Sequence, residues 1–259
     1  MAGTDKLRNR MLALYDKYEK APAKKIEDKV SKYLLEQSGR IQKHVEAFDD
    51  KKSKPTKKEA EKQAEKVLKA YNFEADVLSF YKSIFPLLVM SGDIGNNLSN
   101  LVLYADAKDY KTFAIIEPKY LKFLKDYGLN QAKQITDTTK LKARSVIAEG
   151  IEKGLSYSDI GKNISDKFIE ITPGRAKTIA ETEVHTTFMA TRELNAQAGG
   201  FKEKLWLSSK DKSVRPRHQV FDKVGWVPFD YLWDSMAFPG DPRGSARNTI
   251  RCRCDLLYR

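Results

Sequence analysis

Apolar residues recur every three or four positions over most of residues 5–199, with interruptions at 49–56 and 90–113, and this spacing restricts the fold more than any other feature. Such a spacing places apolar side chains along one face of an α-helix. It predicts a mainly α protein that begins with long N-terminal helices. The expected helices cover residues 5–20, 23–48, 56–81, 118–128, 138–153, 156–169 and 173–199.

Proline and capping residues define the expected ends of the N-terminal helices. Pro22 is expected to end the first one, because a proline disfavours helical backbone in the residue before it. Residues 49–56 lack apolar side chains and are interpreted as a turn or mobile linker. Thr56, with Glu59 three residues later, is expected to cap the next helix. A bend is predicted near residues 92–97, where glycine and asparagine are frequent.

The following helices show similar signals. Pro118 is a suitable first-turn residue. Gly154 is expected to end one helix and Ser156 to cap the next. Pro173 is expected to begin a further helix that ends at the two glycines 199–200.

After residue 200 the pattern changes from helical spacing to alternation. Residues 204–209 alternate as a strand does, and residues 250–256 do so with basic side chains in between. We therefore expect two parts: a basic helical N-terminal region over 1–119, and a second domain over 120–259. The second domain would hold helices over 120–199 and a compact α/β module with a few short strands over 200–259.

Positive charge is concentrated at the two ends of the chain. The net charge is +12, with +7 in residues 1–71, zero in 72–200 and +5 in 201–259. Such a field favours polyanions, so double-stranded DNA is a candidate partner. The alternative is that lysine-rich helices simply have solvated faces. The candidate DNA-binding residues are Lys51, Lys52, Lys54, Lys57, Lys58, Lys62 and Lys66.

No membrane or secretory feature is expected. The N-terminus lacks the apolar run of a signal peptide, and the longest apolar stretch, residues 84–90, is too short to cross a bilayer. Two cysteines one residue apart cannot form a disulfide framework. We expect a soluble protein made in the cytoplasm.

The cysteines suggest one possible cofactor, zinc, and no other is expected. Cys252 and Cys254 are two apart in a predicted strand, which would point both sulfurs to the same side. His218 could supply a third ligand, and Asp211 or Asp222 a fourth. The alternative is a pair of reduced thiols packed in a small core.

No catalytic set is predicted. Glu181 and Glu183 form an E-x-E pair, but a helix would separate them by about 200° around its axis. We expect Arg175, with Glu181 or Glu183, to tie the helix to the C-terminal module through buried or half-buried hydrogen bonds. Asp211, Arg215 and His218 could include a general base. A structural cluster of these three residues that holds a loop in place is the preferred interpretation.

Several motifs in order resemble the Mu F-like minor head proteins of tailed phages, over about residues 120–259. The matching residues that carry the structural motif are Arg175, Glu183, Trp206, Asp211, Arg215 and His218. The other matching residues are Gly154, Ser156, Ile160, Gly161, Ala176, Ile179, Ala180, Thr182, the segment 238–242 and the final C-R-C at 252–254.

The resemblance implies a non-enzymatic structural protein of the phage head that acts in head morphogenesis and in handling packaged DNA. It would lie at the portal vertex or capsid interior, with portal or capsid proteins as partners, after assembly in the host cytoplasm. One alternative is a virion protein whose main role is sequence-independent DNA binding. Another is an effector with nuclease or ADP-ribosyltransferase-like activity.

Overall fold

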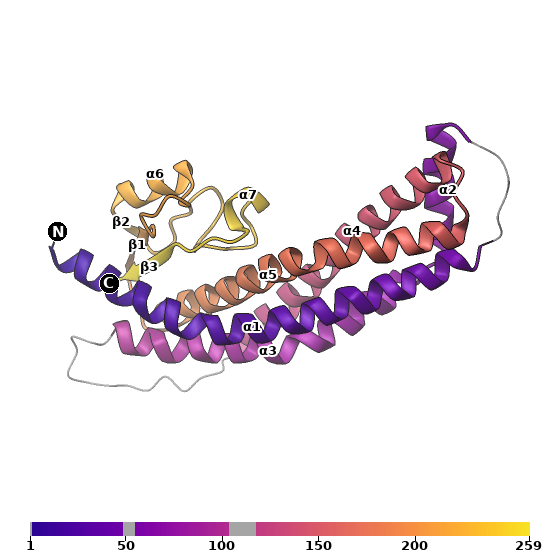
Figure 1. The fold of residues 1–259 in the computed structure, drawn as a ribbon. Helices are drawn as coiled ribbons and strands as arrows, with labels where there is room; N and C mark the ends of the chain where they lie inside the picture. The colour runs from indigo at the N-terminus through magenta and orange to yellow at the C-terminus, as the bar shows by residue number, and fades with distance from the viewer. Residues whose placement is uncertain (1, 49–54, 104–117) are drawn as a thin grey trace. The chain divides into compact units, whose positions relative to one another are not determined.

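The computed structural model describes residues 2–48, 55–103 and 118–259, and it is mainly α-helical, as the periodicity predicts (Figure 1). Long helices come first in the chain, and short elements with a small sheet follow. The long helices are α1 (Ala2–Glu46), α2 (Lys57–Lys69), α3 (Phe73–Leu103), α4 (Pro118–Glu152) and α5 (Tyr157–Ala198). The later elements are β1 (Glu203–Leu207), α6 (Pro216–Val224), β2 (Trp226–Pro228), α7 (Ala246–Thr249) and β3 (Asp255–Tyr258).

Backbone contacts group the chain into two compact units. Unit 1 comprises Met1–Ile26, Phe85–Lys125 and Lys177–Arg259, and unit 2 comprises Glu27–Ile84 and Asp126–Ala176. Four of the long helices contribute residues to both units, so the units do not follow chain order. The domain boundary between residues 119 and 120 stays a prediction. None of the helices in the described residues is long and apolar enough to cross a membrane.

The helices run through several positions that were expected to end them. Pro22 lies inside α1 and Pro173 inside α5, so both predicted boundaries are wrong. A proline inside a helix removes one backbone hydrogen bond and costs about 3 kcal/mol. Burial can offset that cost: Pro22 is itself buried, and Ile26 and Val30 continue the buried face beyond it.

The glycine-based predictions were right at two helix ends, since α4 ends just before Gly154 and α5 just before Gly199, and wrong elsewhere. The bend predicted near residues 92–97 is wrong, because α3 continues through it to Leu103. The helices predicted over 118–128 and 138–153 are one helix, α4. Isolated glycines weaken a helix by only about 1 kcal/mol, so they do not end a helix that is stabilised elsewhere. The linker predicted over 49–56 lies mostly outside the described residues.

One predicted helix is instead divided in two. The helix expected over 56–81 stops at Lys69, and α3 begins at Phe73, where Asn72 accepts a hydrogen bond from the backbone N–H of Ala75 (3.1 Å). The other capping signals are confirmed. Thr56 and Glu59 form a capping box on α2, and the Ser156 hydroxyl accepts from the N–H of Asp159 (3.1 Å).

The sheet of the C-terminal module is antiparallel, with strand order β2-β1-β3. Strand β1 (Glu203–Leu207) confirms the strand predicted over residues 204–209, although side chains on both of its faces are buried. The strand predicted over 250–256 is wrong in its first part, because β3 begins only at Asp255. Residues 250–254, called here the cysteine loop, are irregular, and Arg251 has a left-handed φ of 54°.

Buried ion pairs join α5 to this sheet within unit 1. Arg192 pairs with Asp255 and donates to the backbone oxygen of Leu256 (2.9 Å). Lys204 on β1 is fully buried and pairs with Glu193 at 2.9 Å. Burial lowers the pKa of Lys204 and raises the pKa of Glu193, and the attraction between the two groups opposes both shifts. Both pairs fix one face of α5 against the sheet.

Candidate metal centre

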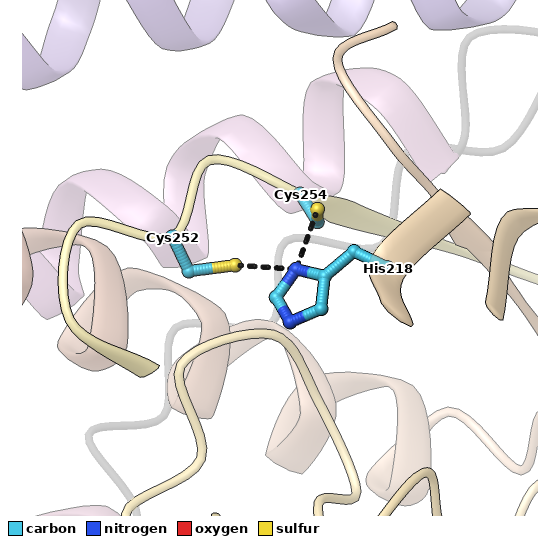
Figure 2. A group of neighbouring side chains, drawn as sticks. All are labelled: His218, Cys252 and Cys254. Atoms are coloured by element: carbon cyan, nitrogen blue, oxygen red, sulfur yellow. Dashed lines mark hydrogen bonds between the residues drawn. The ribbon is translucent and has the colours of Figure 1, made fainter. Parts of the chain in front are cut away.

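The three candidate ligands for zinc converge in the C-terminal module (Figure 2). His218 comes from α6, and Cys252 and Cys254 come from the cysteine loop. The His218 Nδ1 atom lies 3.3 Å from the Sγ of Cys254 and 3.7 Å from the Sγ of Cys252. All three side chains are buried, with exposed fractions of 1%, 1% and 3% for His218, Cys252 and Cys254.

The start of α6 places His218 at this point. Arg215 is extended (φ −63°, ψ 143°), and Pro216 is the first residue of the helix, as the Arg-Pro sequence predicts. His218 is therefore the third residue of α6. Its ring faces the cysteine loop rather than solvent.

The D-x-x-x-R-x-x-H motif holds a loop in place, as the preferred interpretation expects, but through separate contacts to the cysteine loop. Asp211, Arg215 and His218 each contact the cysteine loop. Asp211 accepts from the Arg253 guanidinium (2.6 Å), Arg215 donates to the backbone oxygen of Ile250, and His218 faces the two sulfurs. The motif therefore holds the loop by three separate contacts.

Helix α5 contacts the same loop from another side. Glu181 accepts from the Nε of Arg251 (2.7 Å), and Thr182 Oγ1 accepts from the backbone N–H of Arg251 (3.1 Å). His185 lies one helical turn further along the same face and is buried, with an exposed fraction of 1%. The contacts at Arg251 thus bring His185 close to Cys252.

The segment 238–242 packs on this part of α5. Gly240 has a left-handed φ of 82°, and its backbone oxygen accepts from the Thr186 hydroxyl (3.0 Å). A Cβ atom at Gly240 would lie 3.1 Å from Cδ2 of His185. Any larger residue would therefore crowd His185 as well as strain the backbone.

Arg175 does not tie α5 to the C-terminal module, so that prediction is wrong. Its guanidinium donates to the Thr139 hydroxyl (2.9 Å) and to the backbone oxygen of Ile135 (2.6 Å), both on α4 within unit 2. Burial lowers the pKa of Arg175 to about 10, which leaves it charged at neutral pH. The prediction was correct for Glu181, which pairs with Arg251.

Aromatic rings enclose the candidate site. The Trp206 ring lies 5.2 Å from the His218 ring, 5.0 Å from Phe221 and 5.2 Å from Trp233, all edge to face. Phe221 stacks on His218 at 5.5 Å. This shell excludes water, so charge at the sulfurs must be balanced locally.

The two thiols differ in pKa because they are hydrogen-bonded to each other. Hydrogen bonding from Cys254 lowers the pKa of Cys252 well below its ordinary value, against the effect of burial, and His185 and His218 lower it further. The hydrogen bond to Cys252, together with burial, raises the pKa of Cys254. The sulfur of Cys252 is thus the first to become a thiolate, which is the form that binds metals.

The spacing of the ligand atoms agrees with a tetrahedral metal site. With Zn–S bonds of about 2.3 Å and Zn–N bonds of about 2.05 Å, nitrogen and sulfur ligands lie about 3.6 Å apart. The two nitrogen–sulfur distances at His218, 3.3 and 3.7 Å, lie on either side of this value. A pair of reduced thiols hydrogen-bonded to a histidine would also fit these distances.

Neither aspartate considered as the fourth ligand lies in the site. Asp211 is bound to Arg253 and to the N–H of Ser213 (2.7 Å). Asp222 accepts from the N–H and the hydroxyl of Ser208 (3.3 and 3.0 Å). His185 was missed, and the signal that could have found it is the polar run T-E-V-H-T-T at 182–187, where an apolar helix face would be expected.

The other candidate residues lie elsewhere. Lys57, Lys58, Lys62 and Lys66 are exposed on α2, whereas Lys51, Lys52 and Lys54 lie outside the described residues. Glu183 is buried in α5, and the partly exposed Glu181 lies two residues before it on the same helix. The two carboxylates therefore do not form the shared face that an E-x-E pair on a strand would make.

Comparison with known proteins agrees with the resemblance seen in the motifs. Residues 141–257, a little under half of the chain, match the family described as Phage Mu protein F like protein. The matched range includes every residue of the candidate metal centre. The resemblance predicted from the sequence is thereby supported over this part of the chain.

Two relatives have no described activity. An uncharacterized protein of Bacillus subtilis, YqbB, is 28% identical over 152 residues, which cover 56% of this chain and 50% of the relative. An uncharacterized protein of Methanocaldococcus jannaschii, MJ0329, is 25% identical over 135 residues, covering 52% of this chain and 20% of the relative. The chain thus spans half of the first relative and a fifth of the second. No solved structure matches it.

Proposed function

We propose that the protein is a structural, non-enzymatic minor component of a tailed-phage head that acts in head morphogenesis at the portal vertex or capsid interior. The observation that carries this proposal is the family match over residues 141–257, which covers the last third of α4, all of α5 and nearly all of the C-terminal module. The construction of the module supports it, because the motif residues stabilise a loop.

The structural role of the motif argues for a docking domain rather than a catalytic one. Asp211 and Arg215, two of the polar motif residues, are engaged in contacts to the cysteine loop. The helical setting of Glu181 and Glu183 separates the carboxylates that an ADP-ribosyltransferase would need together. Portal or capsid proteins are the proposed partners, and the virion the proposed location.

The test is to delete the gene from a phage or prophage that encodes it and to analyse the heads that assemble. We expect fewer infectious particles, heads that lack the protein by mass spectrometry, and recovery when the wild-type gene is supplied in trans. Heads assembled without portal protein should also lack it if it binds the portal. Mutant heads of normal composition and infectivity would contradict the proposal.

A second candidate function is sequence-independent contact with packaged DNA. The observation that favours it is the row of exposed lysines Lys58, Lys62 and Lys66, which are four residues apart on α2. That spacing places the three ammonium groups on one helix face, opposite the buried residues Ala60 and Ala64. Such a row can follow a phosphate backbone.

Neutralising this row is expected to weaken binding to double-stranded DNA and to reduce its salt dependence. Each lost phosphate contact should reduce the slope of log K against log salt by about 0.9. The variant has Lys58, Lys62 and Lys66 changed to Gln, and the control has the exposed Lys133, Lys142 and Lys162 changed to Gln. Equal binding by both variants in a salt titration would reject the α2 row as the DNA-binding surface.

A further inference from the structure

We propose that His185, His218, Cys252 and Cys254 bind one zinc ion in a closed tetrahedral site that links α5, α6 and the cysteine loop. This inference concerns the folding of the module and does not depend on which head protein is the partner. It extends the three converging ligands with a fourth from a different helix.

The first support is the geometry of the three ligands that lie together. The metal-binding atoms of His218, Cys252 and Cys254 lie within 4.8 Å of one another, and all three residues are buried. A tetrahedral ion bonded to all three requires separations of about 3.5 to 3.8 Å between its ligand atoms. The observed nitrogen–sulfur distances of 3.3 and 3.7 Å need only small adjustments.

The second support is the position of His185. Two residues of the preceding turn, Glu181 and Thr182, both bond to Arg251, which immediately precedes Cys252. His185 is on the same face of α5 as Glu181 and Thr182, so its side chain is on the side of the helix that contacts the cysteine loop. Gly240 lies against this ring, because a Cβ atom at Gly240 would come within 3.1 Å of the His185 Cδ2 atom. The imidazole is therefore held near Cys252 by two neighbouring segments. To complete the site it must move closer to the other ligand atoms, because the group within 4.8 Å in the described residues comprises His218, Cys252 and Cys254.

The third support is the chemistry of the donor set. Two thiolates and two imidazoles are the ligands of structural zinc sites, which are four-coordinate and tetrahedral. The site is enclosed by Trp206, Phe221 and buried backbone, so there is no exposed position for a substrate. Binding displaces the protons of both thiols, which leave to solvent, and the two thiolates then balance the charge of the ion.

The site also explains a feature of the fold. The cysteine loop is irregular and includes Arg251 in a left-handed conformation, yet both of its cysteines are buried in the core of a module whose sheet has short strands. Few backbone hydrogen bonds hold the cysteine loop. An ion bound by two residues of the loop would fix the loop backbone instead. Zinc would then contribute directly to the folding of the module.

The experiment uses the full chain, expressed with zinc in the medium and purified without chelator. Metal analysis should find one zinc per chain. X-ray absorption at the zinc edge should show two sulfur ligands at about 2.3 Å and two nitrogen ligands at about 2.0 Å. These two measurements on the wild-type protein do not depend on whether any variant folds.

Variants then identify the ligands. Cys254→Ser should lose the zinc, and His185→Gln should raise the dissociation constant for zinc by more than about 10-fold, since even outer-shell partners of zinc ligands contribute 10- to 100-fold. The control is His44→Gln, because His44 is the third histidine of the chain and contacts the Val67 backbone oxygen in unit 2 (2.9 Å). It should bind zinc as the wild type does.

Two results would overturn the proposal in different ways. A folded wild-type protein without zinc above background would mean that the cysteines are a pair of reduced thiols in the core. Unchanged affinity in His185→Gln, with two sulfurs, one nitrogen and one oxygen around the ion, would mean that His185 is not a ligand. Neither result bears on whether the protein belongs to a phage head, which the gene deletion tests separately.

Discussion

Replacing Trp206 by alanine is expected to lower the free energy of unfolding by about 3–5 kcal/mol, the usual cost of truncating a buried aromatic residue. Trp206 has no exposed surface, and its ring contacts those of His218, Phe221 and Trp233. Truncation would leave a cavity, because the neighbouring rings are packed and cannot shift far enough to fill it. Urea unfolding followed by circular dichroism measures the change.

Trp226→Ala is a matched control for this substitution. Trp226 lies in the same sheet but is partly exposed, with the Arg259 guanidinium 4.4 Å from the centre of its ring. It should cost less than half as much, because less apolar surface is buried. Equal losses in the two variants would contradict the view that the Trp206 ring cluster is the centre of the module.

Replacing Arg192 by methionine is expected to cost a similar amount, about 3–5 kcal/mol, for a different reason. Arg192 and Asp255 have exposed side-chain fractions of 2% and 7%, so the substitution leaves an unpaired carboxylate in a nearly dry environment. It also removes the hydrogen bond to the backbone oxygen of Leu256. Equilibrium unfolding in urea at neutral pH measures the loss.

Two comparisons separate burial of the charge from loss of packing. The double variant Arg192→Met, Asp255→Leu should recover most of the stability, because replacing both members of a buried pair by apolar residues is often neutral. Arg217→Met breaks the pair with Asp234 at the surface and should cost much less, because solvent screens an exposed pair. A double variant as unstable as the single one would show that the unpaired Asp255 is not the cause.

Local features of the sequence were predicted well because they depend on neighbouring residues. The capping of α2 by Thr56 and of α5 by Ser156 needs only a hydroxyl three residues before a free backbone N–H. The start of α6 at Pro216 depends on the fixed φ of proline. Strand β1 follows from alternation over a few residues. In each case the residues that determine the structure lie within a few positions of the structure that they determine.

Helix ends were predicted less well because long-range packing competes with local preference. Pro22 and Pro173 disfavour a helix by a fixed local amount, while the burial of a long apolar face stabilises it over many turns. The break at residues 70–72 shows the opposite case, in which a helix ends where the local apolar pattern predicts that it continues. There the Tyr71 hydroxyl donates to Asp76 (2.7 Å), a carboxylate that also accepts from Gln37 and Arg40 on α1.

The sequence by itself determined the helical class of the protein, the position of the small C-terminal module, the family motif and three candidate zinc ligands. These follow from periodicity, composition and spacing, which are properties of neighbouring residues. Only the tertiary structure decided that His218 faces both cysteines, that the cysteines lie in a loop rather than a strand, and that His185 lies near Cys252. The physical reason is that 33 residues separate His185 from His218 and 34 more separate His218 from Cys252. Contacts such as Glu181–Arg251, rather than local backbone preference, bring these segments together.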